Sequence, residues 1–254
     1  MKHSISYTLL ITWILLLASC QSNVVKSGFE TENISVSAEA SGLDSSIIQL
    51  YQPYKNLLDK DMNRVISISE TEMEKDKPES LLTNFLADLL LEEANLEAEQ
   101  QGLSIHSDVS FFNYGGIRTG LPQGNITVEK IYELMPFENE MVFIKLKGEQ
   151  MKAFLDYVAA KGGDSVGGAR FKIKDEKANN IKIDGKALDM QKSYWLVTND
   201  YVASGGDGLS MLQQNEEFVQ SGAKIRDIII RYMERQQENN KILSAKTDGR
   251  ISYE

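Results

Sequence analysis

The sequence predicts an α/β fold, with one domain of mixed sheets covered by helices. Segments with the apolar spacing of helices alternate along the chain with short runs that have strand character. No internal repeat is visible in the sequence. The stretch from 46 to 254, 209 residues, is long enough to bury one core.

Three segments have the periodicity of amphipathic helices. The first covers 79–100, with Ser80 as the expected N-cap. The second begins at Gly148, and the third covers 224–236. A shorter helix, capped by Thr127, is expected to end at Leu134.

Short apolar or alternating runs predict the strands that these helices cover. The expected strands are 108–112, 141–146, 170–174, 194–198 and 250–253. Asp184-Gly185 is a hairpin-type turn between two further short strands. Four glycines between 162 and 168 predict a loop.

The N-terminus has the pattern of an export signal. Lys2 precedes an apolar run, 9–17, that is short for a membrane span. Leu17-Ala18-Ser19-Cys20 then matches a bacterial lipobox, so we expect a lipoprotein signal peptide over 1–19 and a lipid on Cys20. A plain secretory signal with an incidental cysteine is the alternative. Cys20 is the only cysteine, which excludes an intramolecular disulfide.

A polar stretch after Cys20 predicts a flexible tether over 20–45, and the folded domain is then expected over 46–254. This organisation predicts a lipid-anchored protein of the bacterial cell envelope, on its periplasmic or its surface side. The net charge of −10 argues against nonspecific nucleic-acid binding, which requires basic patches.

The segment Asn113-Tyr114-Gly115-Gly116-Ile117-Arg118 follows a predicted strand and has the residue types of a ligand loop. Its two glycines allow a ligand to approach the backbone closely. Arg118 offers a planar fork for phosphate or ribose oxygens, and Asn113 can both donate to and accept from a base edge. By itself the segment could equally be an ordinary glycine turn with a surface arginine.

Two aromatic residues and an aspartate lie in two further loop motifs. Phe137 belongs to Leu134-Met135-Pro136-Phe137-Glu138-Asn139, and Tyr201 ends Thr198-Asn199-Asp200-Tyr201. Two loop rings could hold a flat base between them, although either ring could instead anchor its own loop. In Gly205-Gly206-Asp207-Gly208 the carboxylate could accept bonds from vicinal ribose hydroxyls, or the glycines could mark a simple turn.

The three motifs together, in this order, resemble the C-terminal, substrate-binding domain of the 5′-nucleotidase family. The resemblance covers about 46–254 and implies a four-layer α/β/β/α fold. It also implies that Phe137 and Tyr201 sandwich the base, that Asp207 binds ribose, and that Asn113 and Arg118 contact base, ribose or phosphate. The substrate-binding set expected on this basis is Asn113, Gly115, Gly116, Arg118, Phe137, Asn139, Tyr201, Gly206 and Asp207.

The chain departs from the family at two places. Tyr114 stands where the family usually has glycine, so its ring could either join the pocket or narrow it. Some members carry a substrate arginine shortly before the first long helix, where this chain has Glu74-Lys75-Asp76-Lys77-Pro78. The phosphate contacts on that side are therefore open.

The sequence has no sign of the family's metal-bearing catalytic domain. Only His3 and His106 are present, and none of the metallophosphoesterase signatures occurs. We therefore expect no catalytic or metal-binding residue and no cofactor in this chain, with divalent metals only in a partner metallophosphoesterase. His106 is expected to be a surface or packing residue.

Three hypotheses follow from this combination. In the first, the chain is the nucleotide-recognition domain of a 5′-nucleotidase-type phosphohydrolase completed by a separate metallophosphoesterase chain, with a nucleoside 5′-phosphate as substrate. In the second, it is a non-catalytic envelope lipoprotein that binds nucleosides for scavenging or sensing. In the third, it is a degenerate paralogue without a ligand. The sequence does not fix the base preference, nor does it separate a monophosphate from a cyclic phosphodiester or a nucleotide sugar.

Overall fold

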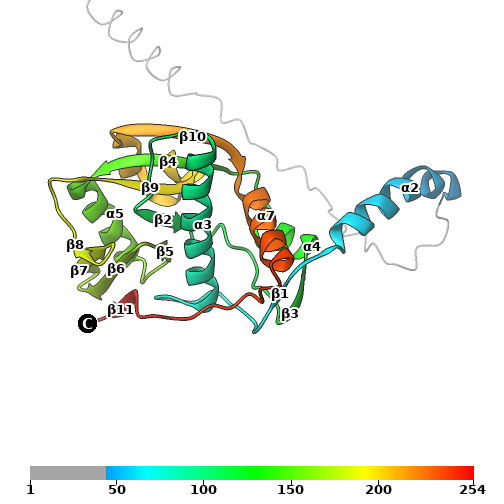
Figure 1. The fold of residues 1–254 in the computed structure, drawn as a ribbon, viewed down its shortest axis with the longest axis horizontal. Helices are drawn as coiled ribbons and strands as arrows, with labels where there is room; N and C mark the ends of the chain where they lie inside the picture. Colours follow the sequence, from blue (N-terminus) through cyan, green and yellow to red (C-terminus); the bar gives the residue numbers. More distant parts are fainter. Residues whose placement is uncertain (1–43) are drawn as a thin grey trace, which may run out of the picture. The chain divides into compact units, whose positions relative to one another are not determined.

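The structure, a computed structural model, describes residues 44–254 and confirms the α/β class. Three open sheets are flanked by helices (Figure 1). A compact unit covers Leu50–Glu254. The predicted signal peptide 1–19, Cys20 and nearly all of the predicted tether lie outside the described residues, so those expectations remain predictions.

A five-stranded sheet occupies the centre of this unit and sets the position of the candidate site. Its strand order is β10 (Glu217–Lys224), β4 (Glu140–Lys147), β9 (Ser193–Asn199), β2 (Val109–Phe112) and β5 (Ser165–Gly167). β2 and β9 are parallel, with Ser110 opposite Val197, whereas the other neighbouring pairs are antiparallel. Because the two strands are parallel, Asn113, which follows β2, and Asn199, the last residue of β9, lie at the same edge of the sheet.

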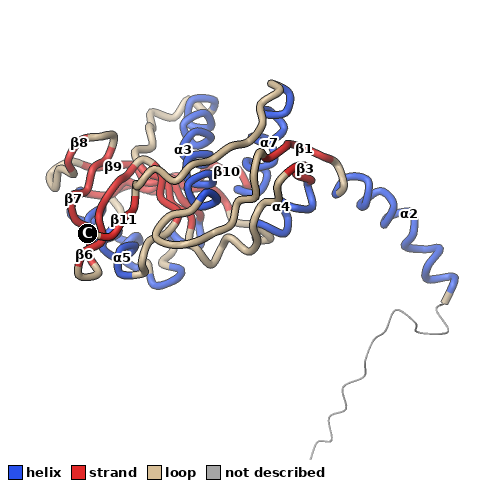
Figure 2. Tube along the Cα trace, turned by 90° about the horizontal axis from the view of Figure 1, so that it is seen from below, coloured by secondary structure: helices blue, strands red, loops and turns tan. Residues whose placement is uncertain are grey.

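The two faces of this sheet are buried in two separate cores, as the alternation of side chains along a strand requires. On β2, Phe112 belongs to the first core and Phe111 to the second. The first face is covered by α3 (Leu81–Gln100) and α7 (Ile225–Glu238). The second is covered by α5 (Gly148–Ala160) and the inner side of the four-stranded sheet. Figure 2 shows the helices and strands of this arrangement from a second direction.

The other two sheets are smaller. The four-stranded sheet has the order β11 (Ile251–Tyr253), β6 (Ala169–Lys174), β7 (Lys177–Ile183) and β8 (Lys186–Ala187). β1 (Val65–Ser69) pairs with β3 (Gly124–Thr127) in the two-stranded sheet.

The predicted caps and the hairpin turn are confirmed. The Ser80 side chain accepts a bond from the Thr83 backbone amide at the start of α3. Thr127 caps α4 (Val128–Leu134) in the same way. Asp184 and Gly185, both with positive φ, connect β7 and β8 as the turn type requires.

One expectation about the connecting segments is wrong, and two elements were not predicted. The glycine-rich stretch 162–168 is not a continuous loop, because Ser165–Gly167 forms β5 and pairs with β2 at the edge of the sheet. The domain also begins with a helix that the sequence reading missed, α2 (Ser45–Met62). β10 was likewise not expected, because its sequence lacks a clear alternation.

None of the residues of α2 is buried, and most of its large apolar side chains are exposed. Those within the compact unit are Leu50, Tyr51, Tyr54, Leu57 and Leu58. Within residues 44–254, no helix combines the length and the hydropathy needed to span a bilayer.

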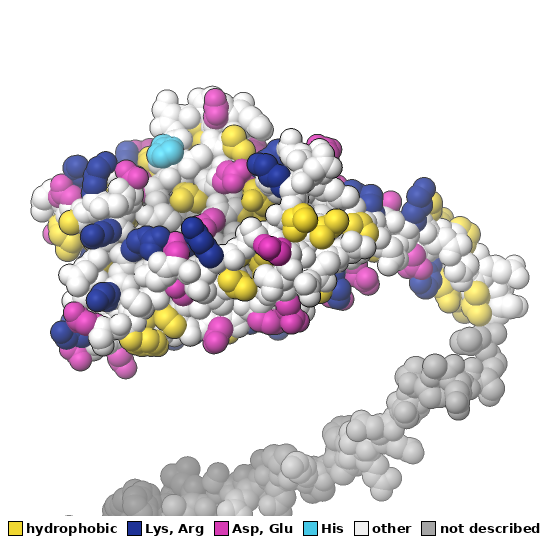
Figure 3. Space-filling view, turned by 60° about the horizontal axis from the view of Figure 1, so that its bottom comes forward, with side chains coloured by type: hydrophobic (Ala, Val, Ile, Leu, Met, Phe, Trp, Pro, Cys, Tyr) yellow, Lys and Arg dark blue, Asp and Glu magenta, His cyan; other side chains and the backbone are white. Residues whose placement is uncertain are grey.

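Charged side chains of both signs cover the surface. On the face that Figure 3 shows, basic side chains lie among acidic ones and do not form one continuous patch. His106, expected to be a surface or packing residue, is exposed.

Candidate functional site

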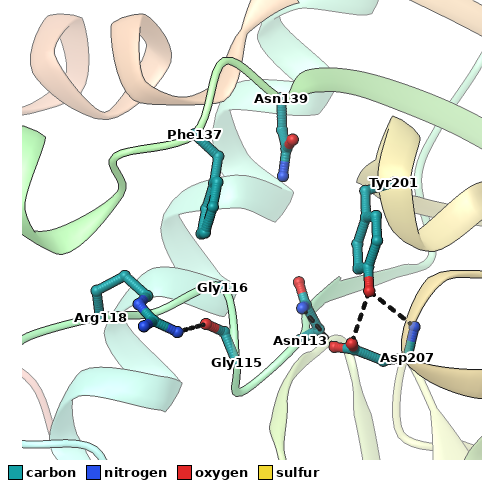
Figure 4. Close-up of a pocket in the computed structure, with 8 residues that line it drawn as sticks. All are labelled: Asn113, Gly115, Gly116, Arg118, Phe137, Asn139, Tyr201 and Asp207. Carbon is teal, nitrogen blue, oxygen red and sulfur yellow. Dashed lines mark hydrogen bonds between the residues drawn. The ribbon is translucent and has the colours of Figure 1, made fainter. Parts of the chain in front are cut away.

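A cavity of about 360 Å³ lies where the three sequence motifs meet. Eight residues line it: Asn113, Gly115, Gly116, Arg118, Phe137, Asn139, Tyr201 and Asp207 (Figure 4). They come from the loop after β2, the loop between α4 and β4, the short helix α6 (Asp200–Ala203), and the 3₁₀ turn at Gly206–Gly208. Of the nine residues expected from the sequence, only Gly206 does not line the cavity. The structure therefore brings together side chains that are up to 94 positions apart.

A hydrogen-bonded network begins at the ends of the two parallel strands. The Asn199 side chain donates to Asn113 Oδ1 at 3.1 Å, and Asn113 Nδ2 donates to Asp207 Oδ2 at 2.6 Å. Asn199 also caps α6 by accepting from the Val202 amide. A side chain at position 116 would come within 2.8 Å of Asn113 Oδ1, so Gly116 is needed for this arrangement. Asn113 is 6% exposed, and these hydrogen bonds fix the orientation of its side chain.

Tyr201 is joined to the same network. Its hydroxyl donates to Asp207 Oδ1 at 2.8 Å and accepts from the Asp207 amide at 3.2 Å. Its ring lies against Gly206, where a Cβ atom would fall 2.4 Å from the nearest ring carbon. Gly206 thus leaves room for the Tyr201 ring. This explains why the motif has a glycine at a position that does not line the cavity.

The Asp207 carboxylate retains capacity to bind a ligand. It accepts one bond from Asn113 and one from Tyr201, whereas a carboxylate has about four acceptor positions. The residue is exposed and has φ of +54°, a left-handed conformation that aspartate tolerates better than most residues. Glycines with positive φ precede and follow it at 205 and 208. The backbone therefore turns the carboxylate toward the cavity, where vicinal hydroxyls could bind it.

Phe137 lies on the opposite side of the cavity from Tyr201. Figure 4 shows the Phe137 ring projecting into the cavity from the loop between α4 and β4, and the Tyr201 ring from α6. Phe137 is 44% exposed and Tyr201 48%, so both rings present apolar surface to solvent and do not anchor the core. Asn139, beside Phe137, adds an amide that can donate or accept. A flat aromatic ligand with polar edges fits this combination of surfaces.

Arg118 supplies the positive charge of the site. Its guanidinium donates to the Gly115 carbonyl at 3.1 Å and is otherwise exposed. The Arg118 amide donates to Leu134 O at the end of α4, which ties the loop after β2 to the segment that carries Phe137. Several guanidinium donors remain directed toward solvent, where an anionic group of a ligand could reach them.

Lys75 binds the backbone of the loop that follows β2. Its ammonium donates to Tyr114 O at 3.1 Å and to Ile117 O at 2.5 Å, and it lies 4.2 Å from the centre of the Tyr114 ring. Burial, together with the nearby Arg118 charge, lowers the pKa of Lys75. The segment 74–78, which lacks the arginine of some family members, therefore contributes a cation that binds the loop backbone.

Tyr114 does not enter the main cavity. It lines a second cavity of about 260 Å³, together with Tyr157 and Asp164. The Asp164 side chain accepts a bond from the Ser165 amide at 2.8 Å and is 6% exposed. Burial raises the pKa of this carboxyl to about 6. Asp207 lines both cavities, so the buried carboxyl of Asp164 and the Asp207 carboxylate face the same second cavity.

Sequence reasoning missed the residues that support the site without lining it. Lys75 lies in a segment that was compared with the family only for its lack of an arginine. Arg226, which donates to the Pro136 carbonyl, lies in the predicted helix 224–236, where nothing in the sequence distinguishes it from the other charged residues. Neither has a sequence signal, since the contacts that each makes join distant parts of the chain. Among residues 44–254, no three His, Cys, Asp or Glu side chains lie together in a way that could hold a metal ion.

Comparison with known families identifies the domain. The model of the family described as "5′-nucleotidase, C-terminal domain" matches residues 58–214, more than half of the chain. The chain belongs to the 5′-nucleotidase family, through its C-terminal domain. The match includes all nine expected site residues, and it begins inside α2.

Similar proteins include much longer chains. Protein UshA of Yersinia enterocolitica is 30% identical over 235 residues, which cover 89% of this chain and 41% of that protein. A 5′-nucleotidase of Vibrio parahaemolyticus is 24% identical over 196 residues, covering 75% of this chain and 34% of that protein. The chain thus spans about two fifths or less of the length of these relatives.

Solved structures show the same fold. A 5′-nucleotidase precursor from Thermus thermophilus superposes with a TM-score of 0.64 at 24% identity, over 82% of this chain and 42% of that chain. The NAD nucleotidase of Haemophilus influenzae gives a TM-score of 0.60 at 19% identity, over 83% of this chain and 42% of that chain. At these identities the likeness concerns the fold alone.

Proposed function

We propose that this domain recognises a nucleoside 5′-phosphate, and that a separate metallophosphoesterase chain carries out its hydrolysis to nucleoside and phosphate. The observation that carries the proposal is the shared cavity, which two exposed rings, a networked aspartate and an arginine all line. Membership in the 5′-nucleotidase family supports the substrate class.

Each residue has a role that its geometry allows. Phe137 and Tyr201 stack on the two faces of the base, and the Asn113 and Asn139 amides contact polar edges. Asp207 accepts bonds from the ribose hydroxyls through the positions that Asn113 and Tyr201 leave unused. Arg118 attracts the phosphate. The divalent metals that activate water would belong to the partner, and no side chain of this domain is assigned a chemical step.

Calorimetry with a panel of nucleosides and nucleotides on the full chain tests the recognition step. We expect adenosine and its 5′-phosphate to bind at one site per chain, and ribose 5-phosphate to bind more weakly because it lacks a base. Failure to bind any nucleoside or nucleotide would contradict the proposed function.

Phosphate release, measured with and without a candidate metallophosphoesterase from the same envelope, tests the catalytic part. We expect release to require both chains and a divalent metal. Binding without release in any pairing would favour the alternative that this is a non-catalytic nucleoside-binding lipoprotein for scavenging or sensing. Release by this chain alone would refute the need for a partner.

We also propose that the protein is anchored in the bacterial envelope through a lipid on Cys20. The lipobox-like sequence before this cysteine supports the proposal. Replacing the cysteine in Cys20→Ser should move the protein from the membrane fraction to the soluble fraction, as followed by immunoblotting. A wild-type protein that is already soluble, or a variant that stays in the membrane, would contradict lipid anchoring.

A further inference from the structure

The loop that carries Phe137 is held almost entirely through its backbone by the start of α7. Arg226 Nη1 lies 3.5, 3.2 and 3.5 Å from the carbonyl oxygens of Met135, Pro136 and Phe137. The other terminal nitrogen of Arg226 binds the Glu138 carboxylate. One guanidinium therefore contacts four consecutive residues of the loop.

The two residues before Arg226 extend this set of contacts. Lys224 Nζ donates to the Glu138 carbonyl at 2.9 Å, and the Ile225 amide donates to the Asn139 carbonyl at 3.0 Å. Five successive carbonyls of the loop, from 135 to 139, are thus bound by three successive residues, 224–226. A turn of this length has few backbone conformations compatible with all five contacts, so the segment 224–226 determines where Phe137 and Asn139 project.

Arg226 is buried, unlike a typical surface arginine. Its side chain is 6% exposed, and its guanidinium lies 4.0 Å from the centre of the Tyr132 ring on α4. Burying a cation is costly unless it is paired and hydrogen-bonded, and here the loop carbonyls and Glu138 compensate the two terminal nitrogens, whereas the buried Nε has no partner. Loss of the guanidinium would leave these acceptors without their partner and would release the loop.

From these contacts we infer that Arg226 is a positioning residue for base recognition: by binding the loop backbone, it sets the distance and tilt of the Phe137 ring across the cavity from Tyr201. The inference rests on the proposed function, since it concerns the same cavity. It assigns Arg226 an effect on the part of the affinity that comes from the base. It assigns none on the part that comes from ribose and phosphate, because Asp207 lies on another element and Arg118 is bound at Leu134 in α4, outside the 135–139 segment.

The test compares adenosine with ribose 5-phosphate, titrated into the full-length wild type and the variant Arg226→Met. We expect the variant to bind adenosine about tenfold more weakly, which corresponds to the lower part of the range for stacking one base. Its affinity for ribose 5-phosphate, measured directly or by displacement of adenosine, should stay within about twofold of wild type. Equal losses for the two ligands, or no loss for adenosine, would overturn the inference.

Arg235→Met is the matched control, because Arg235 lies on the same helix and pairs with Glu92 and Glu93, away from the cavity. It should alter thermal stability without changing either affinity. If Arg226→Met does not fold, Glu138→Gln removes the exposed carboxylate partner alone and should weaken adenosine binding about two- to threefold with ribose 5-phosphate unchanged. An unchanged adenosine affinity in Glu138→Gln would then count against the inference. Absence of adenosine binding by the wild type would instead contradict the proposed function.

Discussion

The two sides of the cavity hold similar rings by different means. On one side, Tyr201 is fixed by residues within six positions of it, through the Asp207 carboxylate and the space above Gly206. On the other side, the Phe137 loop is fixed by α7, with contacts that join residues 86 to 91 positions apart. Local support leaves a recognisable motif in the sequence, whereas support from a distant helix leaves none.

The difference between the sides also concerns charge and strain. The Tyr201 side contains the left-handed Asp207 and adjoins the buried carboxyl of Asp164. The Phe137 side is organised by a buried cation whose partners are mainly backbone carbonyls. We therefore expect the two sides to respond differently to substitution and to pH.

Removing both rings tests whether the two sides act together. The double variant Phe137→Ala, Tyr201→Ala should weaken adenosine binding by about 2–6 kcal/mol, since stacking contributes about 1–3 kcal/mol per base contact and two rings are lost. Calorimetry on the two single variants and the double variant gives the coupling between the rings. Unchanged affinity in the double variant would refute the clamp on the base.

The pH dependence of stability tests the buried carboxyl on the Tyr201 side. With its pKa raised from 3.8 to about 6, folded Asp164 retains a proton between about pH 4 and pH 6 that the unfolded chain has lost. Its contribution to the free energy of unfolding therefore falls as the pH rises through this interval. Asp164→Asn should be more stable than wild type at pH 7, by about 2–3 kcal/mol at most, and equally stable near pH 4.

Denaturant unfolding at a series of pH values measures this difference. Asp184→Asn is the control, because that carboxylate is 84% exposed and its positive φ suits asparagine equally well. A stability difference for Asp164→Asn that does not vary with pH would show that burial does not govern this group.

A smaller change separates the position of the Tyr201 ring from its presence. Gly206→Ala places a methyl group where the ring now lies, so the ring must move and adenosine binding should weaken by about 1–3 kcal/mol. Gly124→Ala is the control, because φ there is +88° and no atom lies within 4 Å of the added group. It should lower the unfolding free energy without affecting adenosine affinity, and an equal effect of both variants on affinity would contradict the contact argument.

The features that the sequence could predict are those that depend on contacts between residues close together in the chain. Ser80 predicted the start of α3, and the alternation over 141–146 predicted β4, whose Val142, Ile144 and Leu146 all lie in the second core, because caps and alternation are local properties. The grouping of the site residues followed from motifs at strand ends, combined with a family resemblance. Their individual roles in binding remain proposals.

What the sequence could not provide depends on long-range packing. β5 was taken for a loop because its glycines conceal a strand that exists only through pairing with β2. α2 was missed because Pro53 lies inside it, and a proline within a helical pattern ordinarily argues against a continuous helix. Arg226 has the sequence environment of any helix surface, and only the folded chain shows that it faces Pro136, 90 positions earlier.

The way in which the 135–139 segment is fastened has an evolutionary consequence. Because its anchoring contacts engage mainly carbonyl oxygens, which every amino acid possesses, mutations that exchange the projecting groups at 137 and 139 leave most of the scaffold intact. Under the proposed function, single substitutions at these two positions would therefore change which nucleobase is preferred without disrupting the fold of the segment.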